Sequence, residues 1–160
     1  MPHALASLPR AAVGAALLCA ALAAHAALGL PESSIAADGS APALQLQQLQ
    51  AQQSGSASPV SAQRVVSPTG VQLTEYVSQG VVFAVSWSGA VMPDLPQLLA
   101  GAFPALHDWL AAHPLLLNQP IAMDTPQLVV RAEGHMRAFR GFAYLPALVP
   151  AGYDINQIGN

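Results

Sequence analysis

Lysine is missing from this 160-residue chain, and its only permanently cationic side chains are five arginines. Without the first 26 residues, four arginines remain against eight carboxylates, a formal net charge of −4. Proteins that bind nucleic acid or dock on anionic lipid need a basic surface that attracts phosphate groups. The composition therefore argues against a nucleic-acid partner and against electrostatic attachment to a membrane.

Cysteine occurs once, as Cys19, and only three histidines follow residue 26. The chain after residue 26 thus has no disulfide, no cysteine nucleophile and no thiolate metal site. His107 and His113 are six residues apart, which does not place two metal ligands on one helix face. The motifs of the common hydrolases, phosphate-binding loops, zinc peptidases and dinucleotide-binding folds are absent. We therefore expect no metal and no cofactor.

A long membrane-spanning run is also missing, but the N-terminus has the pattern of an export signal. Arg10 precedes a small and apolar run over residues 11–24, and Ala24-His25-Ala26 has the small-residue spacing of a signal peptidase site. The run is shorter than the ~20 residues of a membrane helix. The bulky Leu18 disfavours Cys19 as a lipoprotein cysteine. We expect cleavage after residue 26, export to the periplasm or beyond the cell, and no transmembrane anchor.

The rest of the chain divides into two parts by composition. Residues 27–62 are rich in Ala, Ser, Gln and Pro and bury little apolar surface, which predicts a disordered tether. Residues 63–160 contain the periodic apolar patterns of a folded unit, and we expect a single domain there.

Hairpins and one helix account for the patterns in this domain. A strand over residues 71–77 alternates, with Glu75 on its apolar face, and a turn at 78–80 leads to a second strand over 81–87. Asp94 is a good helix cap, and the helix that follows should break at Pro104 and end at Pro114.

A second hairpin follows, with strands over residues 127–131 and 135–144, a turn at 132–134 and a Pro-rich tail. A further strand at residues 63–66 gives the order strand-strand-strand-helix-strand-strand. The predicted fold class is α+β, a small antiparallel sheet of two hairpin units with one broken helix packed on one face.

Five segments in this order resemble a known family: QLTEY at 72–76, GVVFAVSW at 80–87, MPD at 92–94, GHMRAF at 134–139 and AYLPALVPAG at 143–152. Together they are similar to the bacterial secreted family called domain of unknown function 2844, from about residue 65 to the C-terminus. The resemblance implies a Gram-negative cell-envelope or secreted protein and implies no activity.

Charged and aromatic side chains in the two hairpins are the candidate binding residues. His135 shares a strand face with Arg137 in this prediction, and the pair could bind an anion or act as a base. Arg131 is expected near Arg137 across the hairpin, where paired N–H donors could hold a carboxylate or phosphate. The alternative is that the arginines pair with carboxylates of the sheet. The complete candidate set is Glu75, Tyr76, Trp87, Arg131, His135, Arg137, Arg140 and Phe142.

These patterns favour a non-enzymatic binding module of the cell envelope, with another envelope or secreted protein as its partner. Two alternatives stay open. One is a hydrolase or anion-binding enzyme centred on His135 and Arg137, with Glu75 as the carboxylate. The other is a carrier that holds a small apolar ligand between sheet and helix. The oligomeric state does not follow from the sequence.

Overall fold

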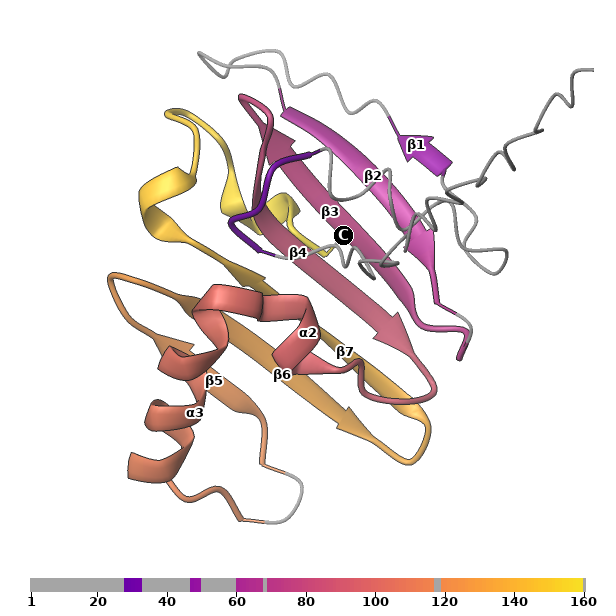
Figure 1. The fold of residues 1–160 in the computed structure, drawn as a ribbon. Helices are drawn as coiled ribbons and strands as arrows, with labels where there is room; N and C mark the ends of the chain where they lie inside the picture. The colour runs from indigo at the N-terminus through magenta and orange to yellow at the C-terminus, as the bar shows by residue number, and fades with distance from the viewer. Residues whose placement is uncertain (1–27, 33–46, 50–59, 68, 117–118, 160) are drawn as a thin grey trace, which may run out of the picture.

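The structure is a computed structural model, and it describes residues 28–32, 47–49, 60–67, 69–116 and 119–159. Most of these residues belong to one antiparallel sheet with short helices on one face (Figure 1). The fold class is therefore α+β, as the sequence predicts. The predicted signal peptide lies outside the described residues, as does most of the predicted tether.

Seven strands form the sheet, in the order β1-β2-β3-β4-β7-β6-β5. Every neighbouring pair is antiparallel. The strands are β1 (Gln47–Leu49), β2 (Val60–Val66), β3 (Gln72–Ser78), β4 (Val81–Gly89), β5 (Ile121–Asp124), β6 (Val129–His135) and β7 (Ala138–Tyr144).

Two of these strands do not figure in the predicted order. β5 lies between the predicted helix end at Pro114 and the strand predicted from residue 127, and its four residues are too few to show an alternating pattern. β1 lies within the predicted tether and pairs with β2. Three strands therefore follow the helix instead of two.

The helical layer is one broken helix: α2 (Leu95–Leu99), the 3₁₀ turn η1 (Ala100–Ala102) and α3 (Phe103–Ala112). Asp94 caps it as predicted, since its Oδ1 accepts the N–H of Gln97 at 3.1 Å. The break comes at Ala100, with a φ of 42°, before Pro104, which lies in the first turn of α3. There the missing N–H of a proline costs nothing.

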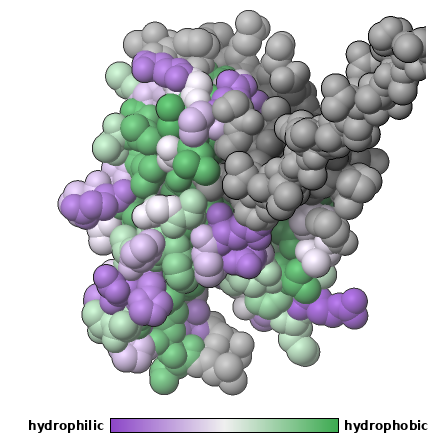
Figure 2. All heavy atoms as spheres, in the orientation of Figure 1, coloured by the Kyte–Doolittle hydropathy of each residue, from purple (hydrophilic) through white to green (hydrophobic). Residues whose placement is uncertain are grey.

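A hydrophobic core fills the space between the helices and the sheet. Leu99 and Leu106 of the helical layer are fully buried against strand residues such as Val85, Val130 and Ala143. Figure 2 shows the outer surface of this helix-bearing face, where hydrophobic groups gather around the short η2 turn (Pro146–Leu148) and polar groups are mixed over α3. The space between sheet and helix is thus filled by the apolar side chains of this core.

An N-terminal segment, residues 28–32, belongs to this core although it falls within the predicted tether. Leu28 is 3% exposed, and its N–H donates to Leu98 O at 3.1 Å. The N–H of Gly29 donates to Val82 O, and that of Val82 to Leu30 O. The segment therefore bonds to β4 just beyond the point at which β7 stops pairing.

Both long hairpins turn through two residues with positive φ. Gln79 and Gly80 connect β3 to β4 with φ of 52° and 75°, one residue fewer than the predicted loop. Met136 and Arg137 connect β6 to β7 with φ of 34° and 70°, so the predicted turn at 132–134 is wrong.

Gly134, which suggests a turn in the sequence, is instead a strand residue. It lies opposite Phe139, and a Cβ at this position would meet the Phe139 ring at 2.5 Å. The glycine therefore makes room for a ring on the neighbouring strand and does not reverse the chain.

A candidate binding trough

The sheet face opposite the helices carries a groove of about 1120 Å³, which we call the trough. Residues of six strands form its floor, and the C-terminal segment, residues 153–159, forms one wall. Its polar and aromatic side chains include Arg64, Thr74, Tyr76, Arg131, Arg140 and Phe142.

The strand register arranges the floor in rows that run across the sheet. One row is apolar and consists of Ala62, Tyr76, Ala84 and Tyr144. The next row includes Arg64, Thr74, Ser86, Phe142 and Arg131, and it continues to Ala122 on β5. A third row is polar, with Gln72, Ser88, Arg140 and Glu133. Paired residues of an antiparallel sheet share a face, so these rows lie side by side.

The C-terminal segment covers the apolar row. The Tyr76 hydroxyl accepts the N–H of Gly159 at 3.0 Å, and Ile158 is 4% exposed. Tyr153 packs edge-on against Phe83, with ring centroids 5.2 Å apart. Burial raises the pKa of the Tyr153 phenol to about 12, and the nearby Tyr76 and Asp154 add to the rise. The part of the floor around Tyr76 is thus closed, whereas Tyr144 at the end of the row stays half-buried.

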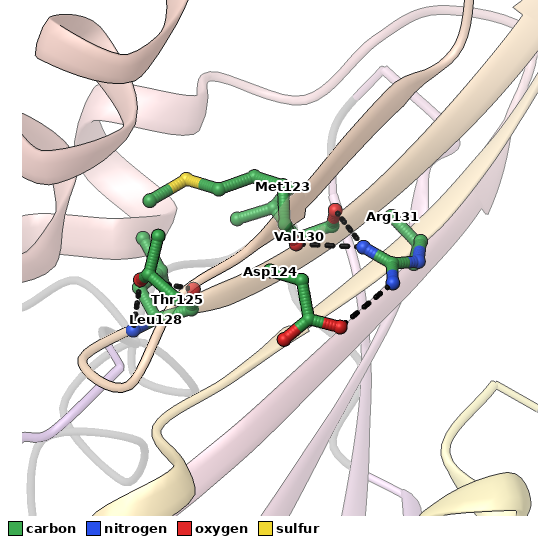
Figure 3. A network of polar contacts seen from close by, with 6 residues as sticks. All are labelled: Met123, Asp124, Thr125, Leu128, Val130 and Arg131. Atoms are coloured by element: carbon green, nitrogen blue, oxygen red, sulfur yellow. Dashed lines mark hydrogen bonds and ion pairs between the residues drawn. The ribbon is translucent and has the colours of Figure 1, made fainter.

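The uncovered part of the floor contains two ion pairs. Arg131 Nη2 lies 3.1 Å from Asp124 Oδ2, and its Nη1 donates to the Met123 carbonyl at 2.6 Å. Figure 3 shows this guanidinium between the carboxylate and the backbone of β5 and β6. Arg140 pairs with Glu133 on the neighbouring strand. Each of these arginines has a carboxylate partner on the sheet, which is the alternative to ligand binding that the sequence leaves open for them.

The turn beside the Arg131 pair is braced by a side chain. Thr125 Oγ1 donates to the Leu128 carbonyl at 2.8 Å and accepts the Leu128 N–H at 3.0 Å. These bonds appear with the Asp124–Arg131 pair in Figure 3. A braced turn keeps Asp124 and Arg131 at one end of the trough.

Arg64 differs from the other two arginines of the trough. No residue of the described part of the chain forms an ion pair with it, and its Nε is buried without a hydrogen-bond partner. A buried guanidinium N–H that lacks an acceptor costs free energy. Arg64 therefore offers a free cationic donor on the opposite side of the trough from Arg131.

Four of the eight candidate residues present their side chains to the trough: Tyr76, Arg131, Arg140 and Phe142. Trp87 borders it, but its indole packs in the core on the helix-covered face. The other three do not meet there. Glu75 is fully buried on the helix-covered face between Gln63 and Val85. His135 and Arg137 are exposed at the end of the β6–β7 hairpin.

The structure thus separates the group proposed for catalysis, because the turn lies at 136–137 and not at 132–134. His135 and Arg137 do not share a strand face, since Arg137 belongs to the turn. Glu75 lies on the opposite side of the sheet from the trough. Arg137 also does not lie opposite Arg131 as predicted, because the residue paired with Arg131 across the hairpin is Phe142.

Several trough residues are outside the candidate set, above all Arg64 and the C-terminal residues around Ile158. Arg64 is an isolated charge in a short strand, and no sequence motif marks it. Alternation along β2 places Arg64 on the same face as Ala62. Only the pairing of β2 with β3 shows that this face belongs to the trough.

The strand edges bear on how a partner protein could bind. The strand predicted at residues 63–66 is not at the edge, because it is paired with β1 at Gln63 and Arg64. At the other edge, β5 is four residues long between Pro120 and Pro126. Short edges beside prolines resist strand addition.

Residues 24–158 match the family described as "Protein of unknown function (DUF2844)". The chain belongs to this family. The match spans the described strands and helices and confirms the resemblance that the five segments indicate. No curated protein and no solved structure matches the chain.

Membrane-spanning helices and clusters of metal ligands were the remaining features to consider in this DUF2844 chain. In the described residues, no helix is long and apolar enough to cross a membrane. Nor does any group of three His, Asp or Glu side chains within the described ranges lie together as metal ligands would.

Proposed function

We propose that this chain is an exported, non-enzymatic binding protein of the cell envelope, and that its trough binds a sugar chain. The observation that carries the proposal is the composition of the trough floor. Guanidinium, carboxylate, amide and hydroxyl groups lie there beside aromatic rings on one face of the sheet. Sites of this kind hold a ligand by ring contacts and fix its orientation by a few polar groups.

The aromatic side chains supply the apolar part of such a site. Phe142 and Tyr144 lie on the same face of β7 with nearly parallel rings, their centroids 6.3 Å apart at 16°. An aromatic face offers apolar contact area, and the C–H face of a sugar ring matches it. Charged planar groups such as Arg140 with Glu133 can donate to and accept from the hydroxyl groups at the ring edge.

A protein partner fits the trough less well than a sugar chain does. The cores of protein interfaces are depleted of charged residues. The uncovered floor instead contains three arginines and two carboxylates. Strand addition is hindered at both edges, for the reasons given above. A sugar chain needs neither an apolar patch nor a free strand edge.

The hydrolase alternative loses the geometry on which it depends. His135 and Arg137 lie at the hairpin end, while Glu75 is on the far face of the sheet. Binding without catalysis requires only the side chains that the trough already brings together.

Export is tested by the N-terminus of the protein recovered from cells. The full chain is expressed in a Gram-negative host, the periplasmic fraction is collected, and the mass of the intact protein is measured. Cleavage after Ala26 gives the mass of residues 27–160. Recovery of the intact chain from the cytoplasm would contradict the export part of the proposal.

Sugar binding is tested on a glycan array that holds neutral and acidic chains. We expect the purified protein to bind a subset of these glycans and Phe142→Ser to lose the signal. Phe103→Ser is the matched control, because Phe103 is a half-buried phenylalanine of the helical layer. Thermal unfolding of each variant shows that it is folded. No bound glycan, or equal loss in both variants, would refute the proposal.

A further inference from the structure

Arg64 on β2 and Arg131 on β6 lie in one row of the trough with three strands between them, and of the two only Arg131 has a carboxylate partner among the described residues. Between them are the half-buried Thr74, the buried Ser86 and the half-buried ring of Phe142, and Gly159 of the C-terminal segment lies beside Ser86 and Phe142. Strands are spaced by about 4.8 Å, so the backbones of Arg64 and Phe142, three strands apart, are separated by about 14 Å. A ligand that contacts both side chains is therefore extended along the row.

The charge distribution favours an anionic ligand at the Arg64 end. The chain after residue 26 has a net charge of −4, yet three of its four arginines line the trough, where Asp124 and Glu133 are the only carboxylates among the described lining residues. Those two carboxylates pair with Arg131 and Arg140. One positive charge is left over, and it belongs to Arg64.

The surroundings of Arg64 also indicate what kind of group is missing. Its Nε is buried and has no acceptor. A guanidinium presents planar N–H donors that match an oxyanion, and such charge-assisted bonds are stronger than neutral ones. An oxyanion bound at the accessible part of this half-buried side chain would supply the counter-charge.

We infer that Arg64 is the anchor for an oxyanion carried on the sugar chain, so that the ligand of the trough is an acidic sugar chain. The inference rests on the proposed function. Arg64 holds the acidic group, Phe142 contacts a neighbouring ring, and Thr74 lies between them within the same row. Arg131 and Arg140, already paired, act as hydrogen-bond donors to hydroxyl groups and do not take the acid.

Three probes of similar length separate the possibilities by calorimetric titration. Tetragalacturonate carries carboxylates, sulfated cellotetraose carries sulfates, and cellotetraose carries neither. The matched variants are Arg64→Gln and Arg137→Gln, which remove the same charge inside the trough and at the exposed hairpin turn. Arg64→Lys keeps the charge without the planar donors, and it replaces Arg64→Gln if that variant does not fold.

We expect at least one acidic probe to bind and cellotetraose to bind more weakly. Arg64→Gln should weaken the acidic probe about 10- to 100-fold, the usual loss of a hydrogen bond to a charged group, and Arg64→Lys should weaken it less. Arg137→Gln should leave it unchanged. Which acidic probe binds tells whether the oxyanion is a carboxylate or a sulfate.

The remaining outcomes separate the inference from the proposed function. If cellotetraose and the acidic probes bind equally and Arg64→Gln changes nothing, the inference is overturned while sugar binding stands. If Arg137→Gln weakens binding as much as Arg64→Gln, only general charge matters, which also overturns it. If neither neutral nor acidic probe binds and the glycan array is blank, both the inference and the proposed function fail.

Discussion

Gly141 lies directly opposite Trp87 on the neighbouring strand, and the indole ring occupies the space where a side chain at position 141 would begin. A Cβ built on Gly141 would lie 2.5 Å from Trp87 Cζ2 and 2.5 Å from the Arg131 carbonyl oxygen. Both contacts are far closer than van der Waals distance. The sheet that underlies the trough is therefore packed around this glycine.

Gly141→Ala should destabilise the protein by about 2–3 kcal/mol, because overpacking forces rigid neighbours apart and the backbone carbonyl cannot move cheaply. Gly101→Ala is the control, since a Cβ there meets nothing within 4 Å. That change should be neutral or slightly stabilising. Urea unfolding measures both, and equal midpoints for the two variants would contradict the packing argument.

The β6–β7 turn should be improved by residues that accept positive φ. Met136 and Arg137 adopt φ of 34° and 70°, and Met136 is 92% exposed. Two-residue turns of this hand prefer Asn-Gly. The double variant Met136→Asn/Arg137→Gly should raise the free energy of unfolding by about 1–2 kcal/mol, since each strained residue costs about that much or less.

The first hairpin gives the reverse experiment. Gly80 has a φ of 75° and open space around its Cα, so Gly80→Ala changes only backbone strain. It should lower the free energy of unfolding by about 1 kcal/mol. Thermal unfolding compares both variants with the wild type. If the Asn-Gly variant is no more stable than the wild type and Gly80→Ala is no less stable, backbone strain in the turns does not affect the stability of this fold.

The two hairpins also show which features of the fold can be predicted from the sequence. The β3–β4 hairpin and the Asp94 cap are predicted because they depend on local pattern, an alternating strand and a capping side chain. The second turn is misplaced because Gly134 looks like a turn residue, whereas its role is to admit the Phe139 ring from across the sheet. Such a contact belongs to tertiary packing and has no local signal.

The residues of the trough likewise differ in how far they can be predicted from local sequence. Tyr76, Arg131 and Phe142 are chosen from the sequence for their chemistry, and register brings them to one face. Arg64 is missed because its importance comes from the lack of a partner, which only the assembled sheet reveals. The group of His135, Arg137 and Glu75 is separated because one misplaced turn moves a residue from strand to loop.

Leu28 tests whether the N-terminal segment is part of the folded unit. Its side chain is 3% exposed in the core, whereas Leu30, two residues on, is 39% exposed. Leu28→Ala should cost about 2–4 kcal/mol, as for a large-to-small change in a core, and Leu30→Ala about 0.5 kcal/mol or less. Chemical unfolding gives the costs, and intact mass checks that processing is unchanged. Equal small costs would mean that the segment does not contribute to stability.

Tyr153 predicts a loss of stability in strong alkali. Its pKa is raised from 10.0 to about 12 in the folded protein, chiefly by burial, so the folded state holds the phenol proton more tightly than the unfolded state. The resulting stabilisation is fully present below pH 10 and is lost as the pH rises from about 10 to 12.

Tyr153→Phe removes this proton, so the difference in unfolding free energy between the wild type and the variant should shrink over the same pH interval. Tyr144→Phe, a change on the same sheet face, should retain the decline of the wild type. Urea unfolding at a series of pH values from 8 to 12 provides the comparison. A constant difference between the wild type and Tyr153→Phe would show that the phenol does not carry the effect.

The central claim is that the trough is the binding surface and that an acidic sugar chain enters it at Arg64. The most direct measurement is a ¹H–¹⁵N NMR titration of the purified protein with the acidic oligosaccharide that the array identifies. We expect the largest amide chemical-shift changes in the strand residues of the trough, around Arg64, Thr74 and Phe142. We also expect Arg64→Gln to abolish these changes at the same ligand concentration. Shifts confined to the hairpin around His135, or to the helical layer, would contradict it.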